Sequence, residues 1–202
     1  FMPSSWHNYA VDFDGDGKAD IAVFRPDAGG GFSAWYIIRS SDGAGVVHSW
    51  GLPGDMPLAS DFNGDGWSDL AVWRESIAWW FILDGRSGML LQAAQWGLPG
   101  DIVRAADLDL DGRADKIAWR PANGTWYVLF SGGGAIGVQW GLPGDIPVPG
   151  TYIEANKVDY AVYRPRTGGL YVLSTGGLSQ AVSTGAPPLA IVVGVQPNSA
   201  IY

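Results

Sequence analysis

The feature that most constrains the fold is a unit of roughly 45 residues that occurs four times in the chain. Each copy has an acidic nine-residue segment that ends in an aspartate, and an arginine follows that aspartate five residues later. The aspartates are Asp20, Asp69, Asp115 and Asp159, and the arginines are Arg25, Arg74, Arg120 and Arg164. Three copies close on the phrase WGLPGD, and the fourth closes on a divergent STGAPPL. Such repetition predicts structural units that stack on one another.

Short β-branched and aromatic runs fill each unit, among them AWYII, AWWFI, TWYVL and LYVL. The 30 glycines and 13 prolines separate these runs by turns, and no segment has the apolar period of a helix. A unit of this length with four strands has the size of a propeller blade. We therefore predict an all-β fold, a four-bladed β-propeller of four-stranded antiparallel sheets in one domain. Its repeats are residues 8–56, 57–101, 102–145 and 146–188.

The last apolar run, LAIVVGV at 189–195, matches the register of the strand that opens the fourth unit. No further unit follows it, so we predict that it completes the first blade and closes the ring. The N-terminal run NYAVDF competes for the same place, and the sequence leaves both alternatives open.

The acidic balance limits the classes of partner. The net charge is −8, and such a surface repels nucleic-acid phosphates and anionic lipids. No apolar run is long enough to span a bilayer, so we expect no membrane insertion. The chain has no cysteine, so disulfides do not stabilise it. The first ten residues lack the features of a signal peptide, and we expect any such peptide to have been removed.

The phrases DFDGDGKAD, DFNGDGWSD and DLDLDGRAD hold eleven of the 20 carboxylates. Carboxylates this close repel one another and raise one another's pKa unless a cation lies between them. Oxygen groups at alternate positions, with glycine for the tight turn, suit a hard cation with irregular coordination, which favours Ca²⁺ over Mg²⁺. The loops are not EF-hands, because position 12 is Val23, Val72 or Ala118 inside a predicted strand, and no helices flank it.

The combination DFDGDGKADIAVFRP, then WY, then WGLPGD resembles the FG-GAP repeat, the integrin α-type or VCBS-like propeller repeat, over residues of about 8–195. The resemblance implies calcium bound between the first two strands of a blade, about three Ca²⁺ ions in all. The implied ligands, with the carbonyl of the seventh loop residue included, are Asp12, Asp14, Asp16, Lys18 and Asp20; Asp61, Asn63, Asp65, Trp67 and Asp69; and Asp107, Asp109, Asp111, Arg113 and Asp115. Leu110 replaces a glycine in the third loop, which predicts strain there. The fourth loop, TYIEANKVD, keeps only Asp159, and we expect it to bind no ion.

Residues that recur at one register are expected to be structural. The arginines are predicted to form a salt bridge or a carbonyl clamp between blades, and Trp50, Trp96 and Trp140 to pack between blades. Three other tryptophans are candidates for holding a ligand such as a sugar ring. They are Trp67, Trp79 and Trp80.

Nothing in the sequence assembles a catalytic constellation. His7 and His48 lie in no recognisable catalytic context, no cysteine nucleophile exists, and no G-x-S-x-G motif occurs. The carboxylates outside the three loops, such as Glu75 and Glu154, are scattered over different units. We therefore expect that the chain is not an enzyme.

These observations predict a calcium-stabilised extracellular module, secreted or at the cell surface, for binding or adhesion. A glycan is the favoured ligand, with a surface protein as the other class. The alternative is a structural unit of a stalk or filament that self-assembles through its terminal strand. A non-catalytic appendage of a larger enzyme is a third possibility.

Overall fold

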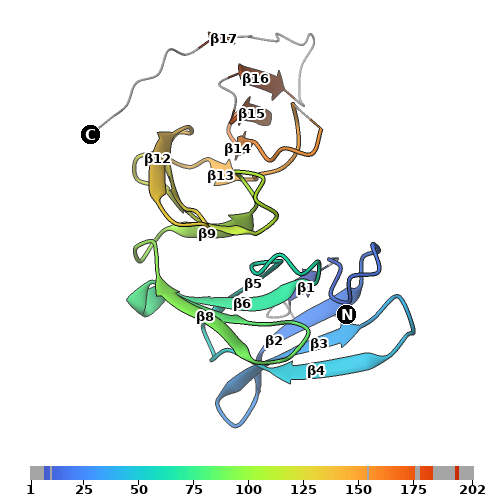
Figure 1. Ribbon diagram of the computed structural model, residues 1–202. Helices are drawn as coiled ribbons and strands as arrows, with labels where there is room; N and C mark the ends of the chain where they lie inside the picture. The colour runs from blue at the N-terminus through green and yellow to red at the C-terminus, as the bar shows by residue number, and fades with distance from the viewer. Residues whose placement is uncertain (1–6, 10, 154, 176–177, 184–193, 196–202) are drawn as a thin grey trace. The chain divides into compact units, whose positions relative to one another are not determined.

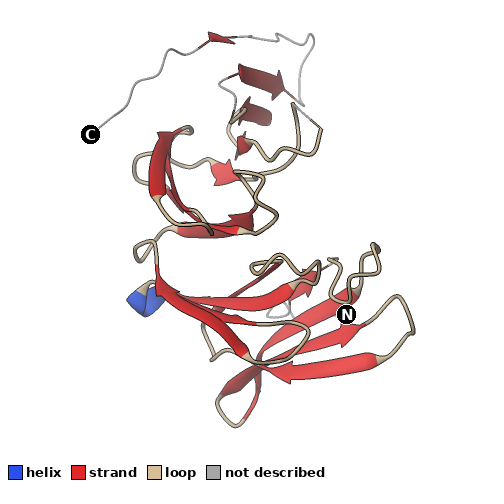
Figure 2. Ribbon diagram, viewed as in Figure 1, coloured by secondary structure: helices blue, strands red, loops and turns tan. Residues whose placement is uncertain are grey.

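The structure is a computed structural model that describes residues 7–9, 11–153, 155–175, 178–183 and 194–195 (Figure 1). Within these ranges the protein is built from antiparallel sheets, and the helical part is a 3-10 turn, Glu75–Ile77 (Figure 2). The chain forms two compact units, the first with two sheets and the second with two more. The all-β prediction is therefore confirmed.

Each sheet follows a simple meander, in which every strand pairs with the next one along the chain. The first sheet consists of β1 (His7–Tyr9), β2 (Ile21–Gly29), β3 (Phe32–Ile38) and β4 (Gly45–Ser49). The second consists of β5 (Met56–Ser60), β6 (Asp69–Arg74), β7 (Trp79–Leu83) and β8 (Leu90–Gln95).

The second unit repeats this arrangement. The third sheet consists of β9 (Ile102–Ala106), β10 (Asp115–Arg120), β11 (Thr125–Leu129) and β12 (Ala135–Gln139). The fourth consists of β13 (Ile146–Pro147), β14 (Tyr160–Arg164), β15 (Gly169–Leu173), β16 (Leu178–Ser183) and β17 (Gly194–Val195). Four meanders from four sequence copies are the element content that the repeat predicts.

The middle two strands of the sheets carry most of the buried side chains. In the second sheet Trp73 of β6 pairs with Trp80 of β7, and in the third Trp119 of β10 pairs with Trp126 of β11. All four tryptophans are buried. Large aromatic pairs at the same register bury much apolar area, so these strands form the core of each sheet.

Each unit has a core shared by its two sheets. In the first unit Phe24 and Trp35 of the first sheet pack in one cluster with Leu70 and Val72 of the second. In the second unit Trp119 and Trp126 cluster with Tyr160 and Val162 of the fourth sheet in the same way. A meander that is buried by its neighbour in this manner is typical of stacked repeats.

The C-terminal strand does not lie where the sequence predicts. Residues Gly194–Val195 pair with Leu178–Ser179 at the edge of the fourth sheet, and His7–Tyr9 takes the first place in the first sheet. The prediction that 189–195 completes the first blade is therefore wrong for its described part, while 189–193 lie outside the described residues. The N-terminal run fills that place because its pairing with β2 spans only the short acidic loop.

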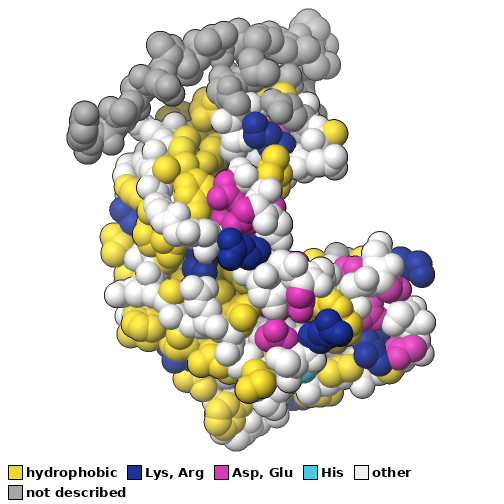
Figure 3. All heavy atoms as spheres, in the orientation of Figure 1, with side chains coloured by type: hydrophobic (Ala, Val, Ile, Leu, Met, Phe, Trp, Pro, Cys, Tyr) yellow, Lys and Arg dark blue, Asp and Glu magenta, His cyan; other side chains and the backbone are white. Residues whose placement is uncertain are grey.

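The surface mixes side chains of all kinds. On the face drawn in Figure 3, carboxylates and bases lie among hydrophobic side chains, and no basic patch covers it. Among the described residues no helix combines the length and the apolar character that crossing a bilayer requires.

Candidate metal-binding loops

The acidic segments are the connections between the first and second strands of the sheets. Residues 12–20 join β1 to β2. Residues 107–115 join β9 to β10, and Asp115 is the first residue of β10. The segment 61–69 lies at the same place in the second sheet. This is the position that the resemblance implies.

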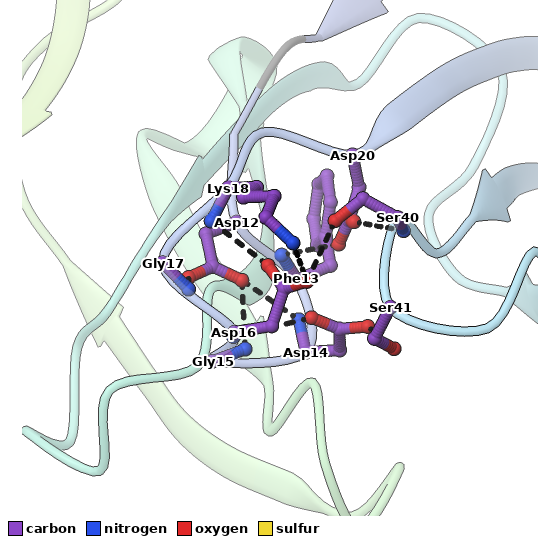
Figure 4. A network of polar contacts seen from close by, with 10 residues as sticks. All are labelled: Asp12, Phe13, Asp14, Gly15, Asp16, Gly17, Lys18, Asp20, Ser40 and Ser41. Atoms are coloured by element: carbon purple, nitrogen blue, oxygen red, sulfur yellow. Dashed lines mark hydrogen bonds and ion pairs between the residues drawn. The ribbon is translucent and has the colours of Figure 1, made fainter.

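The first loop is folded around the carboxylate of Asp12 (Figure 4). Its Oδ1 accepts the N–H of Gly15 at 2.7 Å, and its Oδ2 accepts the N–H of Gly17 at 2.8 Å. The slight burial of Asp12 raises its pKa, but these backbone donors outweigh that effect and hold the pKa below its usual value. The turn thus presents Asp12 ionised and fixed in place.

Asp20 anchors the loop from the opposite end. It is buried, and its two oxygens accept the N–H groups of Phe13 and Ser40, each at 2.7 Å. Carboxylate oxygens of Asp12, Asp14 and Asp20 lie within 4.8 Å of one another. Three of the four predicted carboxylates therefore converge.

Asp16 lies outside that group. Its Oδ2 accepts the Ser40 hydroxyl at 3.0 Å and lies 3.6 Å from the ammonium of Lys18. The Ser41 hydroxyl donates a short hydrogen bond to Asp14. The hairpin after β3 thus supplies hydroxyl donors to the acidic loop, as Figure 4 shows.

The third loop repeats the arrangement. Carboxylate oxygens of Asp107, Asp109 and Asp115 lie within 4.8 Å of one another, and Asp115 is buried. Burial raises the pKa of Asp115, and the negative charges of Asp109 and Asp107 add to the rise. The fourth predicted carboxylate, Asp111, accepts the Ser131 hydroxyl at 2.6 Å instead.

The predicted strain in this loop is present. Leu110 has a φ of 64°, in the left-handed region, where the corresponding Gly15 and Gly64 have 73° and 82°. An L-residue is disfavoured in this conformation because its Cβ approaches the following carbonyl oxygen.

The second loop has the same backbone with a different third residue. Asp61 accepts the N–H groups of Gly64 and Gly66 at 2.6 and 2.8 Å, as Asp12 does for its own glycines. The oxygen of Asn63 accepts the N–H of Asp65 at 2.8 Å. Burial raises the pKa of Asp69 to about 6, and the negative charges of Asp84 and Asp61 add to the rise.

The fourth loop keeps only the anchor. Asp159 is buried and accepts the N–H groups of Tyr152 and Ile153 at 3.0 and 2.8 Å. Phe13, Phe62 and Leu108, which stand where Tyr152 does, are buried, but Tyr152 is exposed. The final aspartate therefore has a structural role in all four loops, whether or not a cation binds.

Consecutive loops contact one another directly. The N–H of Ser68 donates to the carbonyl of Asp12 at 3.0 Å, and the N–H of Ala114 donates to the carbonyl of Asp61 at 2.7 Å. A Cβ built on Gly15 would lie 2.7 Å from the Trp67 indole nitrogen. The seventh residue of one loop thus covers the fourth residue of the loop before it.

The donor set fits a hard cation. The first and third loops each bring together three carboxylates, and the second offers two carboxylates with an amide oxygen. Oxygen ligands in an irregular, flexible loop are what Ca²⁺ accepts. Contacts of the Lys18, Trp67 and Arg113 carbonyls with an ion stay predictions.

A second repeated element is an ion pair of the recurring arginines, whose aspartate partners were not predicted from the sequence. The aspartate of each GLPGD phrase is buried and forms a two-bonded ion pair with the arginine 19 residues later. In the second sheet both Asp55–Arg74 distances are 2.8 Å, and the guanidinium lies 4.8 Å from the centre of the Phe81 ring. The other pairs are Asp101–Arg120 and Asp145–Arg164.

These pairs confirm the prediction that the recurring arginines form salt bridges, but the predicted position between two blades is wrong. Each joins the residue before the first strand to the end of the second strand of the same sheet, so it does not link two blades. The constant spacing of 19 residues was the signal that would have identified the aspartate.

The tryptophans divide by role. Trp50 donates its indole N–H to the Phe81 carbonyl in the next sheet at 3.3 Å, and Trp140 does so to the Tyr171 carbonyl at 3.1 Å. Packing between sheets is therefore confirmed for these two residues. The carbonyl of Trp96 accepts the indole N–H groups of Trp73 and Trp80, both at 3.2 Å.

The three tryptophans predicted to contact a ligand differ in their exposure to solvent. Trp80 has no exposed surface, so the prediction that it offers a ring to a ligand is wrong. The neighbouring Trp79 points to the opposite face of the sheet, because side chains alternate along a strand. Trp79 is half-buried, and its ring is stacked on that of Phe81 with the ring centres 6.0 Å apart. Trp67 is half-buried and packs against Gly15. The guanidinium carbon of Arg86 lies over the Trp67 ring, 5.4 Å from its centre.

His48 lies on β4, half-buried and close to Gly88 of the next sheet. Burial lowers its pKa. His7 lies in β1, and its side chain is outside the described part of the structure.

Comparison with known proteins adds a family match. The FG-GAP-like repeat model matches residues 61–118, which hold the second and third acidic loops. The transglycosylase SLT domain model matches residues 1–38, a minor part of the chain. No curated protein matches the chain.

Two solved structures are similar. One is BBS1N in complex with ARL6DN, soaked with lead, at 11% identity over 94% of this chain and 56% of that chain, with a TM-score of 0.45. The other is a protein of unknown function from Bacteroides caccae, at 14% identity over 91% of this chain and 65% of that chain, also with a TM-score of 0.45. The chain spans less than two thirds of the length of either protein.

The matched segment begins at the first residue of the second loop, Asp61, and ends within β10, so it contains the acidic loops and strands described above. We conclude that the chain contains an FG-GAP-like repeat over residues 61–118, as the motifs in this segment indicate.

Proposed function

We propose that the chain is a calcium-stabilised binding module whose acidic loops fasten neighbouring sheets. The observation that carries the proposal is the convergence of Asp12, Asp14 and Asp20, repeated by Asp107, Asp109 and Asp115, within 4.8 Å in each loop. Bound Ca²⁺ would supply positive charge between carboxylates that otherwise repel one another. The loops contact one another through backbone hydrogen bonds, so ordering one loop supports the next.

Calorimetric titration of the chelator-treated protein tests cation binding. We expect about three Ca²⁺ sites, weaker binding of Mg²⁺, and loss of one site in Asp12→Asn. The matched control is Asp27→Asn, an aspartate of the first repeat outside the loop. Absence of calcium binding to the wild type would contradict the proposal.

We propose further that the four sheets are blades of one propeller. In support, each sheet contains a four-stranded meander, and each pair of sheets shares one core. Small-angle scattering of the calcium-loaded protein tests ring closure, because a closed ring gives one compact particle. A scattering curve of two separated bodies would contradict closure.

The proposed setting is extracellular, where calcium at millimolar level saturates sites of modest affinity. The proposed ligand is a glycan, and the aromatic candidates are Trp79 and Trp67, each partly exposed. A ring with one open face stacks on a sugar ring as it does on other apolar faces. We propose a binding role without catalysis, because the sequence has no cysteine nucleophile and no G-x-S-x-G motif.

A glycan array with the wild type and Trp79→Ala tests the ligand, with a sizing column run alongside. Saturable sugar binding that Trp79→Ala or Trp67→Ala abolishes supports the proposal. Concentration-dependent polymers without sugar binding would instead support a structural unit of a stalk or filament.

A further inference from the structure

The second loop departs from the other two at one position, and the hairpin beside it departs as well. Asn63 stands where the first and third loops have Asp14 and Asp109. The residue after β7 is Asp84, where the first and third sheets have Arg39 and Phe130. A carboxylate is thus missing from the loop and present in the hairpin of the same sheet.

The two exceptional residues contact each other. The Asn63 amide nitrogen donates to Asp84 Oδ2 at 3.0 Å, while its oxygen accepts the N–H of Asp65 at 2.8 Å. Because its nitrogen is held by Asp84, the amide turns its oxygen toward the loop. The other oxygen of Asp84 accepts the N–H groups of Arg86 and Ser87 at 3.0 and 2.6 Å, so the carboxylate is held in place.

The hairpin also approaches the loop closely through its backbone. The N–H of Gly85 donates to the anchor Asp69 at 3.0 Å. A Cβ built on Gly85 would lie 2.1 Å from the carbonyl oxygen of Ser68, so only glycine permits this approach. Asp84 is therefore fixed beside the loop.

We propose that Asp84 is a positioning residue of the second cation site, where it orients the Asn63 oxygen and supplies a third carboxylate. This inference rests on the proposed calcium binding. With Asp84 counted beside Asp61 and Asp69, the second site has three carboxylates, as many as converge in each of the other two loops. An outer partner that fixes a ligand and adds charge affects affinity without touching the ion.

The first loop shows the complementary arrangement. There the hairpin supplies hydroxyl donors, since Ser41 donates to Asp14 and Ser40 donates to Asp16. In the first sheet the hairpin thus gives a donor to a loop carboxylate, and in the second it gives an acceptor to a loop amide. Moving the carboxylate of the second sheet from the hairpin into the loop should therefore preserve the site.

The test follows calcium binding loop by loop in NMR spectra of the full chain. The amides of Gly17 and Gly66 donate to Asp12 and Asp61 at 2.8 Å each and report the first and second loops. Asp84→Asn keeps a turn-capping oxygen but removes the charge. We expect it to raise the calcium concentration for half-saturation at Gly66 about tenfold or more, with a much smaller change at Gly17.

The double variant Asn63→Asp with Asp84→Ser transfers the carboxylate to the loop, and we expect it to restore calcium binding at Gly66. An unchanged response of Gly66 in Asp84→Asn, or an equal loss at both glycines, overturns the inference. So does a wild type in which Gly17 responds and Gly66 does not, although cation binding by the first loop then stands. If neither glycine responds, the proposed function itself fails.

Discussion

At the scale of residues, the fourth position of the acidic loops is glycine in two loops and leucine in the third, and the conformational free energy of the two residue types differs there. Gly15, Gly64 and Leu110 share a left-handed backbone, but only the glycines adopt it without a penalty. The fourth position of the loop is thus set by backbone geometry, and the third loop keeps that geometry despite its leucine.

Leu110→Gly is expected to stabilise the protein. Release of the left-handed conformation gains about 1–2 kcal/mol, and the greater freedom of glycine in the unfolded chain offsets about half of this. We expect a net gain of about 0.5–1 kcal/mol in urea unfolding with chelator present. The control is Gly112→Ala, which has a φ of 84° and open space around its Cβ, and it should lose stability. Shifts of equal sign in both variants would contradict this account.

At the scale of elements, ion pairs close the end of three sheets. The Asp101 carboxylate is buried, and both of its oxygens contact the Arg120 guanidinium at 2.9 Å. The guanidinium lies 4.3 Å from the centre of the Tyr127 ring on the third strand. The pair and the ring thus join three successive segments of one sheet.

Arg120→Leu is expected to cost about 3–5 kcal/mol, because it leaves the Asp101 carboxylate buried without its partner. The double variant Arg120→Leu with Asp101→Leu removes that unpaired charge and should recover much of the loss. Urea unfolding of both variants measures the difference. A double variant less stable than the single one would show that the pair itself, not the burial of one charge, is decisive.

His48 gives one strand a pH dependence. Burial holds its pKa below 6.5 in the folded protein, so the unfolded chain binds the proton more readily. The free energy of unfolding should therefore fall as the pH decreases from above 6.5, relative to a variant without the imidazole. Unfolding of the wild type and His48→Gln at pH 7.5 and 5.5, with saturating calcium, measures this. Parallel pH profiles would contradict it.

At the scale of the whole molecule, the loops lie at one end of each sheet and the ion pairs close the first two strands at the other. Within each unit the two sheets are joined by a shared core and by an indole hydrogen bond, that of Trp50 or Trp140, and in the first unit the two acidic loops also contact each other. Stability of the assembly should thus depend on cations at the loop end.

Calcium removal is expected to lower the melting temperature. Each site stabilises the folded protein by about 2.7 kcal/mol when calcium exceeds its dissociation constant a hundredfold. This is a large share of a typical total of about 5–15 kcal/mol. Calorimetric melting with calcium and with chelator measures the effect, and an unchanged midpoint would contradict it.

The repeat made the fold largely predictable, because the aspartates, arginines and WGLPGD phrases that recur at a nearly fixed spacing indicate where the strands lie and in which order they follow. The loop carboxylates were predicted for the same reason, since alternation and glycine spacing specify oxygen ligands. The place of 194–195 was not, because an apolar run fits the edge of either the first or the fourth sheet equally well. The Asp84–Asn63 contact was missed because it joins residues 21 apart in one copy only, and no repetition marks it.

The carbonyl of Trp96 receives two buried indoles, those of Trp73 and Trp80, and the carbonyl of Trp140 receives Trp119 and Trp126. Buried indoles emit light at shorter wavelengths than indoles in water. Each pair should therefore give a strong intrinsic fluorescence change when its sheet opens. The protein carries optical probes in each half, and the difference in emission between the wild type and a variant with one pair replaced by phenylalanine would report the opening of that pair's sheet.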